Sequence, residues 1–140
     1  MIQTANVMLL TDDGKLILQL RDDKPGISCP GQITAFGGMC ESNEIPLETA
    51  KREMQEELGL RLNDDDLTPW TVFRKTMAEH GEDSFVNLFV LGHSLRPEEL
   101  TVYEGQGYFL VSPDDDLDKI NFTPAARQFV AQFFKEYPRT

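Results

Sequence analysis

The sequence from Gly38 to Leu60 reads GMCESNEIPLETAKREMQEELGL, and this stretch decides the fold. Pro46 suits the first position of a helix, where the missing N–H would have no intrahelical partner, and Gly59 suits the position just past the end. Between them, apolar side chains recur at helical spacing, at Leu47, Ala50, Met54 and Leu58. The stretch therefore predicts a helix over residues 46–58 with one buried face.

Three glutamates, Glu53, Glu56 and Glu57, share another face of this helix. Like charges three and four residues apart repel one another and weaken an isolated helix. Carboxylate oxygens suit a hard divalent cation such as Mg2+ or Mn2+, whereas zinc prefers His and Cys. The alternative is a solvated acidic face, which is the usual fate of arbitrary glutamates. The full spacing of the stretch favours a metal site.

The residues around the helix start suggest how it is held in place. Glu44 precedes the helix and Arg52 projects near its acidic face, so an ion pair between them would fix the loop against the helix. Two separate surface charges are the alternative. Gly37 and Gly38 allow the backbone to approach another group closely, although paired glycines also form ordinary turns.

The stretch resembles the signature of the Nudix hydrolases. Written as G-x5-E-x7-R-E-apolar-x-E-E-x-G-apolar, it matches that signature at every fixed position. The resemblance implies an α/β fold, an α/β/α sandwich with a mixed β-sheet, in which the motif forms a catalytic loop–helix–loop. It also implies hydrolysis of a nucleoside diphosphate linked to another moiety.

The resemblance further implies a divalent cofactor, Mg2+ or Mn2+. Its ligands would be Glu53, Glu56 and Glu57, with the backbone carbonyl of Gly37 as one more. Glu104, in the sequence EGQ at residues 104–106, resembles an acidic loop of MutT-like members that supplies a further metal ligand or the base.

The predicted catalytic residues are Glu53, Glu104, Arg52 and Glu44. Either Glu53 or Glu104 would be the base. Glu44 and Arg52 would support the loop and the helix.

Three residues are predicted to contact the substrate: Arg21, Phe36 and Gly38. Arg21 opens the loop RDDKPGISCPG, which loosely resembles a loop of sugar-nucleotide-cleaving relatives. Ala126 aligns with an asparagine that reads the base in members specific for oxidised guanine, so we expect weak discrimination between oxidised and normal guanine nucleotides. The substrate class stays open.

The rest of the chain predicts strands on either side of the helix and a second helix at the end. The turn HGED at residues 80–83 would join the two longest strands. The predicted strands are Ala5–Leu10, Lys15–Leu20, Ile33–Phe36, Leu67–Met77, Phe85–Leu91 and Gly107–Val111, and the second helix is Thr123–Tyr137. Trp70, Phe73 and Tyr108 could stack on a base, although core packing is the commoner fate of aromatic residues.

Composition limits the classes of partner. The chain has 140 residues, enough for one domain spanning residues 1–140 with a real core. A net charge of −11 argues against binding a nucleic-acid polymer but permits a small nucleotide that enters as a metal complex. The first ten residues, MIQTANVMLL, lack the pattern of a signal peptide, no apolar run would span a membrane, and two cysteines are too few for a disulfide framework. We therefore expect a cytoplasmic protein, and the edge strands leave room for a homodimer.

The leading hypothesis is a Mg2+-dependent pyrophosphohydrolase of a nucleoside diphosphate derivative, such as a nucleoside triphosphate or a nucleotide sugar. The alternative is a non-catalytic module of the same fold that binds a nucleotide without cleaving it. Such a module would be expected to have lost one of the carboxylates of the motif, and this chain keeps all four.

Overall fold

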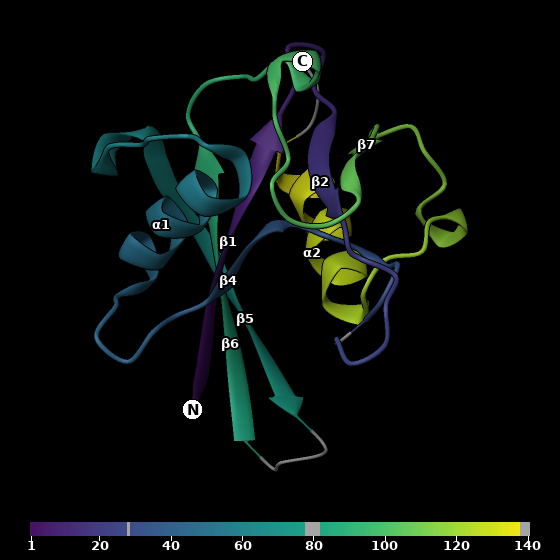
Figure 1. Cartoon of the computed structure of the whole chain (residues 1–140). Helices are drawn as coiled ribbons and strands as arrows, with labels where there is room; N and C mark the ends of the chain where they lie inside the picture. Colours follow the sequence, from purple (N-terminus) through teal and green to yellow (C-terminus); the bar gives the residue numbers. More distant parts are fainter. Residues whose placement is uncertain (28, 78–81, 138–140) are drawn as a thin grey trace.

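The computed structural model describes residues 1–27, 29–77 and 82–137. It contains seven strands and two α-helices, joined in part by short 3-10 turns (Figure 1). The strands are β1 (Ile2–Leu10), β2 (Leu16–Leu20), β3 (Ile33–Thr34), β4 (Phe36–Met39), β5 (Leu67–Met77), β6 (Glu82–Leu91) and β7 (Gly107–Val111). The helices are α1 (Pro46–Leu58) and α2 (Pro124–Glu136), and the 3-10 turns are Asp64–Asp66, Pro97–Glu99 and Leu117–Lys119.

Strand β1 lies at the centre of a mixed sheet. The order is β3-β2-β1-β6-β5, while β4 also pairs with β1 and β7 also pairs with β2. β1 and β6 run parallel, and the other strand pairs are antiparallel. The register places Gly37 of β4 opposite Asn6 of β1, which brings this glycine beside the central strand of the sheet. This is the mixed sheet that the sequence predicted.

The two helices cover opposite faces of the sheet (Figure 1). Successive residues of a strand point to opposite faces, so each strand supplies both cores. Val7 and Leu9 of β1 pack with Met54 of α1, whereas Met8 packs with Phe129 of α2. The layers are therefore helix, sheet and helix, as predicted. Among the described helices, none is both long and apolar enough to cross a bilayer.

Helix α1 begins and ends where the sequence predicts. Pro46 occupies its first turn, and Gly59 closes it in the left-handed conformation with φ of 68°. The N–H of Gly59 donates to Gln55 O, at 2.9 Å. At the start, the N–H of Ile45 donates to Glu48 Oε1, at 3.0 Å, so the chain satisfies this end without a hydroxyl cap.

Other boundaries differ from the prediction. The strand expected at residues 33–36 is two strands, because the chain leaves β2 and joins β1 on either side of Ala35. β6 begins at Glu82, so residues 82 and 83 of the predicted turn belong to a strand, and His80 and Gly81 lie outside the described residues. α2 is one residue shorter at each end, since Thr123 caps it and Tyr137 closes it.

Candidate active site

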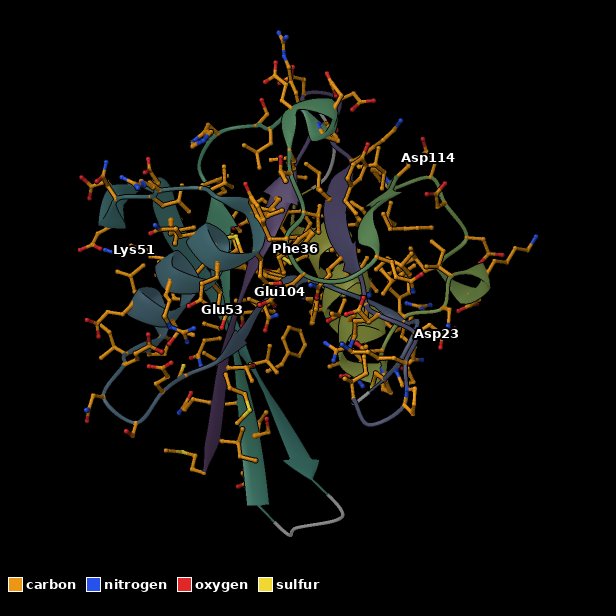
Figure 2. All side chains as sticks on the ribbon, viewed as in Figure 1. Asp23, Phe36, Lys51, Glu53, Glu104 and Asp114 are labelled. Carbon is orange, nitrogen blue, oxygen red and sulfur yellow. The ribbon has the colours of Figure 1, made fainter. Side chains whose placement is uncertain are left out.

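Three carboxylates meet where α1 faces the loop that precedes β7. They belong to Glu53, Glu57 and Glu104, and one oxygen of each lies within 4.8 Å of the others. Figure 2 shows Glu53 on α1 beside Glu104 on the loop. Glu53 and Glu57 lie one helical turn apart, so the helix itself brings them together. Glu104 lies on the loop before β7, which the fold places beside α1. We call these three side chains the acidic cluster.

Glu57 is the buried centre of the acidic cluster, with 1% of its surface exposed. Its Oε1 accepts a hydrogen bond from the N–H of Gly37, and its Oε2 accepts one from Gln19 Nε2, both at 2.9 Å. Burial raises the pKa of the Glu57 carboxyl, and the neighbouring Glu53 raises it further. Burial and the charges of nearby acidic residues also raise the pKa of Glu104, although this side chain is exposed.

The predicted ion pair between Glu44 and Arg52 is present. Arg52 Nε donates to Glu44 Oε2 at 2.7 Å and its Nη2 donates to Glu44 Oε1 at 2.9 Å, so both ends of the contact are paired. Hydrogen bonds from Arg52 and from the N–H of Glu41 lower the pKa of Glu44 to about 2. Arg52 Nη1 also donates to Glu53 Oε1 at 2.9 Å and to Glu56 Oε2 at 3.2 Å. One guanidinium thus links the loop to the acidic face of α1.

The two glycines before the loop have different physical roles. Gly37 has φ of 144°, and a Cβ there would lie 2.1 Å from the carbonyl oxygen of Ala5 on the neighbouring strand. Gly38 makes room for the side chain of Glu53, since a Cβ at residue 38 would lie 2.5 Å from Glu53 Oε1. The first glycine is therefore required by the sheet and the second by the carboxylate of Glu53.

A pocket of about 450 Å³ opens beside the acidic cluster. It has acidic residues at its base, two cations on the β2–β3 loop and one aromatic ring. Its lining residues are Gln19, Arg21, Asp22, Lys24, Ile27, Gly37, Glu57, Tyr103, Glu104 and Gly105. Phosphate groups neutralised by a cation could be bound between the acidic and the basic walls of such a pocket.

The three residues predicted to contact the substrate lie in different surroundings in the structure. Arg21 lines the pocket, and its contact with a substrate stays a prediction. The prediction for Phe36 is wrong, because its side chain is fully buried in the core against α1 and cannot reach a ligand. Gly38 does not line the pocket and instead accommodates Glu53. Ala126, on α2, is likewise fully buried in the core. The expected weak discrimination between oxidised and normal guanine nucleotides stays a prediction.

Glu56 lies outside the acidic cluster. Its carboxylate is half exposed and accepts a hydrogen bond from Arg52, although its charge contributes to the raised pKa of Glu104. The role of Glu56 as a metal ligand therefore stays a prediction. The role of the Gly37 carbonyl also stays a prediction, because Gly37 contacts Glu57 through its N–H and not through its carbonyl.

Gln19 and Tyr103 are among the pocket residues that were absent from the predicted site. Gln19 lies in the strand LILQL, where one amide among apolar residues is a signal that could have been noticed. Tyr103 is 64% exposed at the pocket and directly precedes Glu104. The aromatic residues that the sequence suggested lie elsewhere: Trp70 and Phe73 pack against α2, and Tyr108 lines a different surface pocket.

The acidic cluster fits a hard divalent cation. All of its side-chain donors are carboxylate oxygens, which Mg2+ and Mn2+ prefer over the softer ligands of zinc. A buried carboxylate with a raised pKa beside two others is destabilising unless a positive charge compensates it. Among the ion pairs of the described residues, Arg52 contacts Glu53 but neither Glu57 nor Glu104, so the cluster retains excess negative charge.

Comparison with known proteins gives consistent results. The sequence model of the NUDIX domain matches residues 2–133. The nucleoside triphosphatase NudI of Escherichia coli O139:H28 is 33% identical over 113 residues, which are 76% of this chain and 79% of that protein. The solved MutT protein of Methanosarcina mazei Go1 has a TM-score of 0.74 at 21% identity and covers 98% of this chain and 95% of its own. A MutT NUDIX hydrolase of Burkholderia pseudomallei gives 0.72 at 23% identity, covering 94% and 96%.

Proposed function

The chain belongs to the Nudix hydrolase family, and from that premise we propose that it is a Mg2+- or Mn2+-dependent pyrophosphohydrolase of nucleoside triphosphates. The observation that supports this most is the acidic cluster of Glu53, Glu57 and Glu104, because Glu57 and Glu104 line a pocket that also presents Arg21 and Lys24. The choice of a nucleoside triphosphate among nucleoside diphosphate derivatives follows from the relative described as a nucleoside triphosphatase.

The proposed reaction is hydrolysis of a phosphoric anhydride. A water molecule attacks one phosphorus, the P–O bond to the departing phosphate group breaks, and the products are a nucleoside monophosphate and pyrophosphate. The proton of the water passes to a carboxylate. The chemistry requires little covalent participation by the protein, because positioning and electrostatic stabilisation lower most of the barrier.

Some residues of the site would bind the cation, and others would orient those ligands. Glu53, Glu57 and Glu104 would hold the cation, which when bound neutralises charge on the phosphates and acts as a Lewis acid. Glu104 is the exposed member of the cluster, so it is the carboxylate that water reaches and our choice for the base. Arg52 and Glu44 orient Glu53 through the ion pair described above.

The rest of the pocket would bind the nucleotide. Arg21 and Lys24 suit the outer phosphates, because their cations lie on the β2–β3 loop beside the acidic cluster. The exposed ring of Tyr103 offers a face on which a base could stack. Stacking is tolerant of base identity, since every base has a π-face.

The experiment is a substrate screen of nucleoside triphosphates, nucleotide sugars and dinucleotides with Mg2+ or Mn2+, with products separated by chromatography. We expect monophosphate and pyrophosphate from at least one nucleoside triphosphate, and no turnover in excess EDTA. Full turnover after metal stripping would refute the metal-dependent mechanism. Tight nucleotide binding without any product would instead support the non-catalytic binding module.

A further inference from the structure

Gln19 connects the two halves of the acidic cluster. It lies on β2, and with period-2 alternation its side chain points to the same face as Ile17, which packs in the core under α1. The side chain is buried, with 6% of its surface exposed. Its Nε2 donates to Glu57 Oε2 at 2.9 Å and to the backbone carbonyl of Glu104 at 3.2 Å. One amide thus contacts the helix ligand and the loop ligand together.

The loop approaches Gln19 closely. Gly105, next to Glu104, has φ of 89°, and a Cβ there would lie 2.6 Å from the carbonyl oxygen of Leu20 and 3.3 Å from Gln19 Cγ. The chain can therefore lie against β2 only because residue 105 has no side chain. The amide of Gln19 lies beside this approach, since its Nε2 would be 3.3 Å from the same Cβ.

The donors around Glu57 are neutral. Gly37 N–H contacts one oxygen and Gln19 contacts the other, so each carboxylate oxygen keeps a lone pair while its orientation is fixed from two strands. A cationic side chain in the place of Gln19 would cancel the charge that a metal ion needs. A neutral amide orients the carboxylate and leaves that charge in place.

We infer that Gln19 is a positioning residue that raises the affinity of the acidic cluster for its divalent cation, by fixing the carboxylate of Glu57 and the loop of Glu104 in one arrangement. Partners that orient a ligand from behind typically change metal affinity or activity by about 10- to 100-fold. This inference rests on the proposed function only in assuming that a cation binds at the cluster.

The test is titration of metal-stripped protein with Mn2+, followed by electron paramagnetic resonance of the free ion. We expect Gln19→Leu, which has no donor, to weaken Mn2+ binding by about tenfold or more. Gln19→Asn keeps an amide but is one methylene too short to reach both partners, so it should weaken binding similarly. Asn also keeps a polar group in the strand, and circular dichroism establishes whether each variant is folded.

The matched control is Gln106→Leu. Gln106 belongs to the same loop, and its Nε2 donates to the carbonyl of Arg21 at 2.8 Å without contacting the acidic cluster. If Gln19 acts on Glu57, the Gln106 variant should keep Mn2+ affinity close to wild type. An equal loss in both variants would show that Gln19 only tethers the loop, and wild-type affinity in the folded Gln19→Asn protein would also overturn the inference.

Activity of the same proteins separates this inference from the proposed function. If Gln19 orients the cluster, its variants should regain part of their kcat at high Mn2+ concentration, while KM for nucleotide at saturating metal changes little. Mn2+ binding that depends on Gln19 in a protein that hydrolyses no nucleotide would refute the proposed function and uphold the role of Gln19. Nucleotide hydrolysis by wild-type protein, together with unchanged Mn2+ affinity in the Gln19 variants, would uphold the proposed function and refute the role of Gln19.

Discussion

Replacing Glu57 with glutamine tests the acidic cluster most directly. The ligand oxygens of the cluster lie within 4.8 Å of one another. At that distance two unit charges repel by about 3.5 kcal/mol with an effective dielectric constant of about 20. We count only Glu53 and Glu57, because Glu104 is exposed and its charge is screened. The substitution removes this repulsion, but its new amide group faces the amide of Gln19, which costs about 1–3 kcal/mol.

The net effect should depend on pH. Burial and Glu53 raise the pKa of Glu57 in the folded protein, so the folded state holds this proton more tightly than the unfolded chain. The stabilisation is complete below the ordinary carboxyl pKa and is lost as pH rises through the raised value. Metal-free wild-type protein should therefore lose stability from pH 6 to pH 9, and Glu57→Gln should lose less. At the upper pH we expect the variant to be the more stable by about 0.5–2.5 kcal/mol.

The assay is chemical denaturation in EDTA and again in Mg2+, with kcat measured in parallel. Wild-type protein should gain about 2.7 kcal/mol at a Mg2+ concentration of 100 times Kd. Glu57→Gln should gain little, and its kcat should fall by at least about a hundredfold, as for loss of a key electrostatic group. A variant that Mg2+ stabilises as much as wild type, with unchanged kcat, would refute a metal-binding role for the cluster.

Three further substitutions probe the rest of the site. Gly38→Ala should displace the carboxylate of Glu53 and reduce both metal affinity and kcat, while the melting temperature changes little because the neighbour is a movable side chain. Thermal melts beside Mn2+ titration check this, and a strongly destabilised protein would contradict it. Glu104→Gln should lower kcat far more than it raises KM, since a base or ligand acts mainly in the transition state. A changed KM with constant kcat would limit this residue to lining the pocket. Tyr103→Ala should raise KM for nucleotide but not for inorganic triphosphate, because only the former has a base to stack.

Local interactions were the part of the structure that sequence predicted best. Helix α1 begins at Pro46 and ends at Leu58 as expected, because Pro and Gly act on the backbone beside them. The pairing of Arg52 with Glu44 was predicted for the same reason, since eight residues that include a helix start restrict where the two side chains can go.

Long-range placement was predicted less well. Phe36 was expected at the substrate, yet its strand position turns it into the core, and the face of a strand depends on register that sequence does not reveal. Ala126 lies on the buried face of α2, which a loose sequence alignment does not reveal. Gln19 was missed because its partners lie 38 and 85 residues away in sequence.

The central position of β1 has a consequence for how the chain folds. Ile2 lies beside Ser84, so β1 acquires its parallel neighbour only after most of the chain is available. Closing so long a loop costs entropy before its contacts can compensate, and topologies of this kind fold slowly. The site needs a further long-range contact, because the loop that carries Glu104 is held near Glu57 by Gln19 and by β7 pairing with β2. We therefore expect Mg2+ to slow unfolding and leave the refolding rate nearly unchanged, since the site does not exist until the barrier has been crossed.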